Sequence, residues 1–201
     1  MCGRYDLSES PAAIRAHFNV PASPDFAANH DIRPTQRAPI IRLNPLSVKR
    51  ESSMARWGLV PAWAKDMKFG THTINARVET VASLPAYRAA FRNRRCLVPV
   101  SAFFEWHGPS GKRTKYRVSM EEQPLFALAG LWERWTNPQT GEIVETYTIV
   151  TTGANQTLAQ IHERMPVIVP PERYENWLDT GCTQMDLFVP VAEAGLKVEM
   201  G

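Results

Sequence analysis

Short apolar segments, interrupted by prolines and polar residues, dominate the hydrophobic pattern of this chain. Most of them have the length of a strand and are rich in β-branched or aromatic residues, so they predict a mainly antiparallel sheet. The predicted strands are APIIRL (38–43), SMARWGLV (53–60), CLVPV (96–100), AFFEWH (102–107), KYRVSM (115–120), LFALAGLWERW (125–135), ETYTIVTT (145–152) and MPVIV (165–169). GPSGK, between AFFEWH and KYRVSM, predicts a hairpin loop.

Helical signals are fewer and shorter. Ser10 followed by Pro11 is typical of an N-cap and a first helical residue, and predicts a helix through Phe18. Further helices are predicted over 86–94, 154–161 and 170–178, the last on the surface, with a proline-broken loop over 19–37. We therefore expect an α+β fold: a single domain over 1–201, built around a curved, mainly antiparallel β-sheet or barrel with short flanking helices.

Composition narrows the class of protein. A hydrophobic content of 44% and a charged content of 21% are ordinary for a globular protein. No apolar run approaches the ~20 residues of a membrane-spanning helix, and the N-terminus lacks a signal-peptide pattern. Cys2, Cys96 and Cys182 form no CxxC pair, which argues against disulfides and structural zinc. We expect a cytoplasmic protein without membrane association, metal or cofactor.

The first candidate for chemistry is Cys2, directly behind Met1. Removal of Met1 would give Cys2 a free α-amine, with a pKa near ~7.7–8.0, beside a thiol with a pKa near ~8.5. Such a pair condenses with an aldehyde to an imine and then to a five-membered thiazolidine ring, whereas a lysine forms only the imine. The alternative is that Cys2 has no role, because chain ends tolerate change.

A second candidate is the segment TINARVET (73–80). In an extended segment, Asn75 and Arg77 point to the same face. The amide of Asn75 can orient a reacting group, and the guanidinium of Arg77 can bind a phosphate with two hydrogen bonds. A turn asparagine and a solvated arginine are the alternative.

Glu105 and His162 are candidates for proton transfer. The aromatic neighbours of Glu105 favour a desolvated carboxylate with a raised pKa, but simple alternation would turn it outward to water. His162 lies in a predicted loop, where general acids and bases are common, although a surface or capping role is the alternative.

Basic and aromatic residues together favour single-stranded nucleic acid, because bases stack on aromatic rings while cations bind phosphates. The aromatic candidates are Trp57, Trp63 and Trp106. The basic residues cluster in two stretches: Arg88, Arg92, Arg94 and Arg95, then Lys112, Arg113, Lys115 and Arg117. The net charge of only +3 leaves open a solvated basic face and core tryptophans.

Seven motifs in order make the chain resemble the SOS response-associated peptidase (SRAP) family over essentially its whole length. They are MCGRY, RPTQ, RWGLVPAWAKD, INARVET, RRCLVPVSAFFEW, LAGLWERW and TIVTTGANQTLAQIHERMPVIV. Two positions depart from the family pattern: Ala102 replaces a frequent glycine, and Ala64 replaces a second tryptophan found in some members.

The resemblance implies a sensor and shield of abasic sites in single-stranded DNA, which traps the ring-opened sugar as a thiazolidine crosslink. Cys2 would be the nucleophile, Asn75 would position it and the sugar, Glu105 would shuttle protons, and His162 would assist sugar opening and reversal. The implied DNA contacts are phosphate binding by Arg4, Arg77 and Arg164 and a wedge of Pro34 and Trp63 against a duplex end. Base stacking on Trp106 is expected from its aromatic ring.

The same resemblance implies autoproteolytic removal of Met1 and contact with single-strand/double-strand junctions. We expect a monomer that is associated with the nucleoid. Two rival functions remain open. N-terminal-nucleophile amidohydrolases also begin Met-Cys-Gly, but the Asn-Gly pair of their oxyanion site is absent from this sequence. A noncovalent single-stranded DNA-binding module would need no chemistry at Cys2.

Overall fold

The computed structural model describes residues 2–181 and 195–201. Its strands are β1 (Arg4–Leu7), β2 (Asn29–Ile32), β3 (Arg37–Leu43), β4 (Arg50–Trp57), β5 (Asn75–Arg77), β6 (Arg95–Val100), β7 (Ala102–His107), β8 (Thr114–Met120), β9 (Phe126–Thr136), β10 (Ile143–Gly153), β11 (Arg164–Pro166), β12 (Ile168–Val169) and β13 (Leu196–Met200). Its helices are α1 (Pro11–Phe18), α2 (Arg88–Asn93), α3 (Gln156–Ala159) and α4 (Tyr174–Leu178), with 3-10 turns η1 (Met67–His72) and η2 (Pro171–Arg173).

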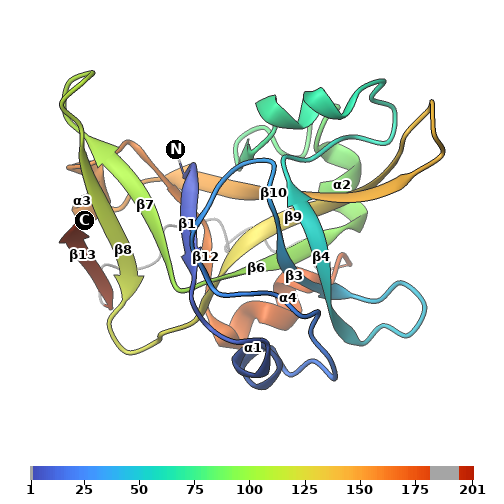
Figure 1. The fold of residues 1–201 in the computed structure, drawn as a ribbon, viewed down its shortest axis with the longest axis horizontal. Coiled ribbons are helices and arrows are strands. Elements are labelled where there is room, and N and C mark those ends of the chain that lie inside the picture. Colours follow the sequence, from blue (N-terminus) through green and yellow to red (C-terminus); the bar gives the residue numbers. More distant parts are fainter. Residues whose placement is uncertain (1, 182–194) are drawn as a thin grey trace.

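The strands form two sheets, which lie side by side in Figure 1. The smaller sheet has the order β13-β8-β7-β1-β2. In the larger sheet, β10, β4, β3, β6 and β9 follow one another, and pairing of β9 with β10 closes them into a barrel. β10 runs parallel to β4 and β5, and the other described pairings are antiparallel. The predicted α+β fold with a mainly antiparallel sheet is confirmed.

An aromatic cluster packs β1 of the smaller sheet against the barrel. The ring centroids of Tyr5 and Trp57 are 5.2 Å apart, and the hydroxyl oxygens of Tyr5 and Tyr147 are 2.6 Å apart. All three side chains are fully buried. Trp57 is therefore a core residue and offers no face to a DNA base, which is the second of the two alternatives that the sequence left open. The cluster also fixes the position of β1, which begins two residues after Cys2.

Several predicted elements are confirmed and others need correction. Helix α1 begins at Pro11, and the Ser10 hydroxyl accepts a hydrogen bond from Ala13 N, as a cap should. The predicted loop 19–37 contains β2, because this segment finds a partner in β1. MPVIV divides into β11 and β12, which pair with different strands, β10 and β9. Helix α4, predicted on the surface, buries Tyr174, Trp177 and Leu178.

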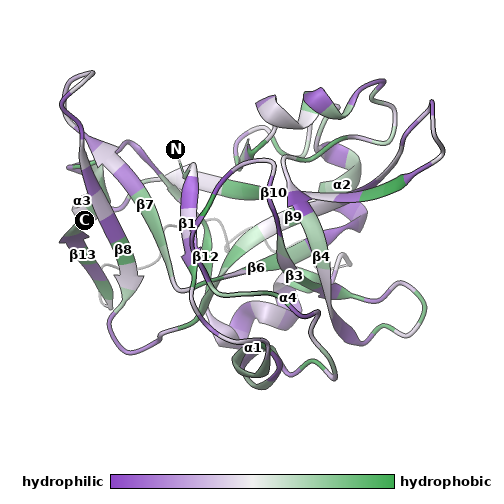
Figure 2. Cartoon of the chain, viewed as in Figure 1, coloured by the Kyte–Doolittle hydropathy of each residue, from purple (hydrophilic) through white to green (hydrophobic). Residues whose placement is uncertain are grey.

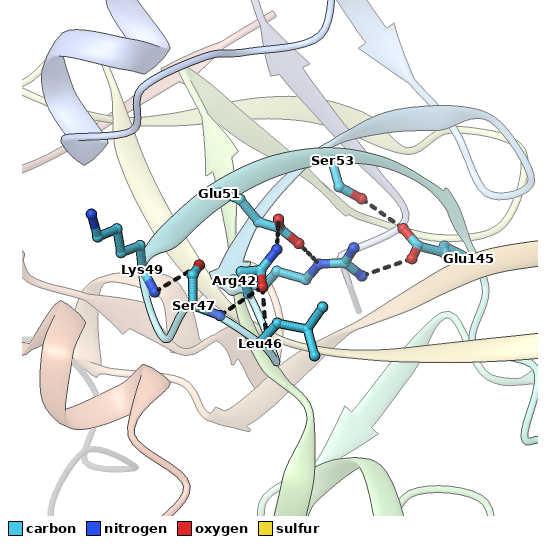
Figure 3. Close-up of polar contacts among 8 residues, drawn as sticks. Arg42, Leu46, Ser47, Lys49, Glu51, Ser53 and Glu145 are labelled. Atoms are coloured by element: carbon cyan, nitrogen blue, oxygen red, sulfur yellow. Dashed lines mark hydrogen bonds and ion pairs between the residues drawn. The ribbon is translucent and has the colours of Figure 1, made fainter.

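A buried arginine links three barrel strands (Figure 3). Arg42 on β3 donates to Glu51 on β4 at 2.7 Å and to Glu145 on β10 at 2.9 Å. Its guanidinium also lies 4.0 Å from the ring centroid of Trp132. Ser53 donates to the second oxygen of Glu145 at 2.7 Å. Because a buried charge is tolerated only when it is paired, we assign this network a role in stabilising the barrel.

The segment before Asn75 is held by the chain around Gly58. Gly58 N donates to Tyr147 O at 2.8 Å, and the Trp57 indole donates to Ile74 O at 2.8 Å. Gly58 has φ +113°, and a Cβ there would lie 2.3 Å from the carbonyl oxygen of Gly70. Only glycine allows this approach of two backbones.

We expect Gly58→Ala to destabilise the protein strongly, since it combines a positive φ with a clash against backbone. Gly111→Ala is the matched control, because Gly111 has φ +82° and no atom lies within 4 Å of the place that its new methyl group would take. A positive φ costs roughly 1–2 kcal/mol for an alanine, and overpacking adds roughly 1–3 kcal/mol. Urea unfolding would measure both variants; equal losses would contradict the importance of the Gly58–Gly70 contact.

Candidate active site

Antiparallel pairing of β1 with β7 brings the start of the chain to Glu105. Arg4 pairs with Phe104 and Tyr5 with Phe103, so the residues before Arg4 run toward the second half of β7. Cys2 is 0% exposed and Glu105 is 3% exposed. Residues 102–105 are all buried, because both faces of this part of β7 are covered. Alternation, which would turn Glu105 outward to water, is wrong here.

Asn75 holds the backbone of Cys2. Its side-chain Nδ2 donates to Cys2 O at 2.8 Å, and β5 places it opposite Ile149 of β10. Tyr87 Oη donates to Asn75 O at 3.0 Å, and burial raises the pKa of Tyr87 to about 12, so this donor keeps its proton. The amide Oδ1 of Asn75 is buried without a hydrogen-bond partner among the described residues. It is available to accept from a substrate hydroxyl or amine.

Burial controls the protonation of Cys2 and Glu105. It raises the pKa of the Cys2 thiol well above its ordinary value, and the nearby carboxylate of Glu105 adds to this rise. The partly ionised thiol expected from the sequence is therefore not the resting form. Burial also raises the pKa of Glu105. A carboxyl group with a raised pKa beside a protonated thiol is suited to proton transfer.

His162 lies between α3 and β11, where the following strand fixes its ring. Arg164 N donates to His162 Nδ1 at 2.9 Å, and Arg164 O lies 3.2 Å from the same nitrogen. The shorter N–H contact favours Nδ1 as the acceptor, with the ring proton on Nε2. Burial lowers the pKa of His162, which keeps the imidazole neutral at physiological pH. His107 Nδ1 donates to Ile161 O at 3.1 Å and connects this loop to the end of β7.

A cavity of about 480 Å³ opens between the His162 loop and the β7–β8 hairpin. Its lining residues are Trp106, His107, Gly108, Pro109, Arg113, Ile161 and His162. In Figure 2, β7 and β8 are hydrophilic near their shared hairpin and hydrophobic further along. The polar end of the hairpin thus lies at the cavity, next to the strand position of Glu105.

Comparison with known proteins identifies the family. The model of the family "SOS response associated peptidase (SRAP)" matches residues 1–198. The chain belongs to the SRAP family. It is similar to the abasic site processing protein YoqW of Bacillus subtilis strain 168, with 36% identity over 190 residues, which cover 92% of this chain and 84% of the relative. The abasic site processing protein HMCES of Xenopus tropicalis is 31% identical over 157 residues, 67% of this chain and 47% of its own length.

Solved structures agree with this SRAP fold. A crystal structure of a protein from Bacteroides thetaiotaomicron superposes with a TM-score of 0.90 at 26% identity, covering 99% of this chain and 91% of that one. A protein from Bordetella bronchiseptica gives a TM-score of 0.85 at 27% identity, covering 100% of this chain and 99% of that one.

The three arginines that SRAP resemblance assigns to phosphates differ in their surroundings. Arg77 is exposed on β5, two residues from Asn75. Arg4 is half-buried, 3.5 Å from Asp31, with its guanidinium 5.4 Å from the ring centroid of Trp106. Arg164 is only 12% exposed, and its guanidinium makes two hydrogen bonds to Glu79. Arg77 is thus the most accessible of the three.

Pro34 and Trp63 are the two residues predicted to contact a duplex end. Trp63 is 58% exposed and contacts Phe69 edge-on, with ring centroids 5.2 Å apart. Pro34 is half-buried and precedes Thr35, whose φ is +77°. Within the described part of the chain, no hydrogen bond or ring contact joins either residue to Cys2. Both remain predicted DNA contacts.

The two basic stretches also differ. In the first, Arg94 is paired with Glu133 at 2.6 Å, and Arg95 is buried beside the ring of Trp177. In the second, Arg113 lines the cavity and Lys115 lies 3.9 Å from the ring centroid of Phe104. The second stretch is therefore the one at the candidate site.

Sequence reasoning missed Tyr87 and Glu79. The pattern predicts Tyr87 only as an apolar position of a helix face, and nothing local indicates its hydrogen bond to β5. Glu79 follows Arg77 by two residues in INARVET. Its negative charge indicates that it could pair with a cation, but its partner Arg164 is far along the chain and could not be identified from the sequence.

Among described residues, no cluster of His, Cys, Asp or Glu suits a metal ion, and no described helix has the length and apolarity to cross a membrane.

Proposed function

We propose that this protein captures abasic sites in single-stranded DNA as a covalent thiazolidine crosslink to Cys2. The observation that carries the proposal is the juxtaposition of Cys2, held by the Asn75 amide at 2.8 Å, with the buried Glu105. Membership of the SRAP family and similarity to proteins named abasic site processing proteins support the same target. An abasic site offers no base edge to read, but its ring-opened form offers an aldehyde.

The chemistry begins after Met1, which lies outside the described residues, has been hydrolysed from Cys2. The free α-amine of Cys2 attacks C1′ of the aldehyde, and loss of one water gives an imine. The thiol sulfur then adds to C1′, and its proton goes to the nitrogen, which closes the five-membered ring. No oxidant or cofactor is needed. In this scheme the autopeptidase step and the crosslink use the same residue.

Proton transfer is assigned to Glu105 and His162. The thiol of Cys2 is protonated at rest, so a neighbouring base must accept its proton as sulfur attacks, and Glu105 is placed to do so. Neutral His162 donates through Nε2 to the sugar oxygen as the ring opens. The Oδ1 acceptor of Asn75 orients the amine or a sugar hydroxyl.

DNA binding is assigned to the surface around this pocket. Arg77 and Arg4 bind phosphates, and Trp106 stacks on a base beside the lesion. Pro34 and Trp63 contact a duplex end at a single-strand/double-strand junction, with Ala64 weakening this wedge. The protein acts as a monomer associated with the nucleoid.

A denaturing gel tests the proposal directly. Purified protein is incubated with matched single-stranded oligonucleotides that contain one abasic site or none. We expect a band of retarded, covalently bound DNA with the abasic oligonucleotide only. Binding without such a band would support a noncovalent module, and glutamine hydrolysis would support an amidohydrolase; either result in the absence of crosslinking would overturn the proposal.

Intact-mass measurement provides a second test. The purified protein should lack the mass of Met1, and peptide mapping after reaction should place the sugar adduct on Cys2. Retained Met1 would leave the amine blocked, since a peptide nitrogen cannot form an imine. An adduct on any other residue would contradict the proposed nucleophile.

A further inference from the structure

Two arginines lie directly opposite each other on β3 and β4, which are side by side in Figure 1. Arg37 begins β3 and pairs with Arg56, the residue before the last of β4. Side chains of directly opposed residues share one face of a sheet, with Cβ atoms about 4.5–5.5 Å apart. Like charges in such a pair repel each other and destabilise the sheet. An anion bound to both would remove this repulsion.

Within the described part of the chain, no carboxylate forms an ion pair with either arginine. Arg37 is exposed, and its Nη2 donates to Met54 O at 3.0 Å. Arg56 is half-buried, and its Nη1 is buried without a hydrogen-bond partner among the described residues. Burial lowers the pKa of Arg56. By contrast, the neighbouring Arg33 donates to Asp31 at 2.9 Å. The positive charge of the opposed pair is therefore uncompensated.

Contacts connect this pair to both residues that are predicted to contact a duplex end. The turn that carries Pro34 is tied to the end of β4, because Thr35 N donates to Trp57 O and Trp57 N donates to Gln36 O, both at 2.9 Å. Thr35 has φ +77°, and a β-branched residue keeps such a backbone only where the surrounding structure fixes it. The turn is thus held firmly beside the start of β3.

The segment that carries Trp63 packs over the other arginine. A Cβ on Gly70 of η1 would lie 3.2 Å from Arg56 Nη1, so η1 contacts the guanidinium. Phe69, next to Gly70, contacts the ring of Trp63 edge-on, with centroids 5.2 Å apart. A chain of contacts therefore runs from Trp63 through η1 to Arg56.

We propose that Arg37 and Arg56 together bind one DNA backbone phosphate at a duplex end that Pro34 and Trp63 contact. This inference rests on the proposed function, in which those two residues contact such an end. Guanidinium groups bind phosphate oxygens through directed N–H bonds, and a phosphate supplies the negative charge that the described surroundings of the pair lack. The site favours junction DNA over a single strand, because only a junction places a paired nucleotide beside Pro34 and Trp63.

Equilibrium binding of the full chain to two oligonucleotides tests this site. One is a single strand and the other is the same strand with a duplex arm; neither contains an abasic site, so the result does not depend on crosslinking at Cys2. Arg37→Gln should weaken junction binding roughly tenfold, the scale of one charge-assisted hydrogen bond, and reduce the salt dependence by about one phosphate contact. Single-strand affinity should stay unchanged. An equal loss on both DNAs, or no loss on the junction, would overturn the proposal.

Further variants make the result specific. Arg56→Gln should resemble Arg37→Gln, and the loss in the double variant should differ from the sum of the single losses, because both guanidinium groups bind the same phosphate. Arg15→Gln is the matched control, since Arg15 is exposed on α1 and forms no ion pair with the described residues; it should bind both DNAs like wild type. Strictly additive losses would contradict a shared phosphate.

Stability measurements separate a binding role from a structural one. Removing one of two opposed like charges should leave the resistance to urea equal or higher. A variant that unfolds more readily but binds junction DNA normally would make the pair structural and overturn the proposal.

Inorganic phosphate distinguishes a free anion from a DNA phosphate. Thermal unfolding is compared in phosphate and in chloride at equal ionic strength. A phosphate-dependent rise in Tm that Arg37→Gln removes, with junction binding unchanged in that variant, would assign the pair to a free anion and overturn the DNA contact. Weakened junction binding, with or without such a rise, supports it.

Discussion

Cys2→Ala is expected to abolish the stable crosslink to abasic DNA while preserving noncovalent binding of intact single-stranded DNA. The substitution removes the only sulfur that can close a ring with the α-amine of the same residue. Arg77, Arg4 and Trp106 remain, so the binding surface persists. Denaturing gels measure the crosslink, and fluorescence anisotropy with an intact oligonucleotide measures binding.

Cys96→Ala is the matched control for this variant, because Cys96 is also a fully buried free cysteine. It should retain the crosslink. Cys2→Ser should still form an imine through its amine, which borohydride reduction would trap, but without reduction the adduct should hydrolyse. A normal yield of unreduced crosslink from Cys2→Ala would refute the thiazolidine assignment.

Glu105→Gln is expected to slow crosslinking by roughly 10²–10⁴-fold, the range typical of lost general acid–base catalysis. Glutamine keeps the shape of the side chain but cannot accept the proton of the buried Cys2 thiol. Single-turnover rates at saturating abasic DNA separate this effect from binding. Near-normal rates would reduce Glu105 to a structural role.

The same variant, which is expected to react more slowly, should unfold less readily at neutral pH. Burial raises the pKa of Glu105 in the folded protein, whereas in the unfolded chain its pKa is near ~4.3. As the pH rises above that unfolded-state pKa, ionisation of Glu105 therefore favours the unfolded state. Glu105→Gln should therefore be more stable than wild type at neutral pH, and the difference should disappear below about pH 4, where the unfolded carboxyl is also protonated. Urea unfolding at both pH values checks the sign; a less stable variant at neutral pH would contradict it.

Helix α1 and most strands were predictable because their signals are local. Ser10 and Pro11 mark a helix start through contacts within one turn, and the apolar segments of β6 and β9 mark strands by composition alone. Strand β2 was missed because a four-residue polar segment becomes a strand only when β1 pairs with it. Helix α4 was misplaced because its burial depends on what packs over it.

The candidate site also has some features that the sequence predicts and others that depend on the fold. Residue type makes Cys2, Asn75, Glu105 and His162 candidates for nucleophilic and proton-transfer chemistry, and the SRAP resemblance predicts the role of each. Their protonation and mutual placement come from the fold. Burial raises the pKa of Cys2, where the sequence indicated a partly ionised thiol, and it raises the pKa of Glu105, where the sequence left two alternatives open. Neither could be fixed locally, because desolvation depends on chain segments far away in the sequence.

Arg164 shows most clearly what cannot be predicted from neighbouring residues in the sequence. As a residue type it fits a phosphate contact, and nothing in its neighbourhood along the chain indicates that the fold also pairs it with a carboxylate 85 positions away. Composition and motif order thus account for the family and the chemical groups, which are encoded by neighbouring residues. Only the folded chain assigns each group its partner, its charge state and its access to DNA, because hydrogen bonds and desolvation act between residues that the sequence keeps apart.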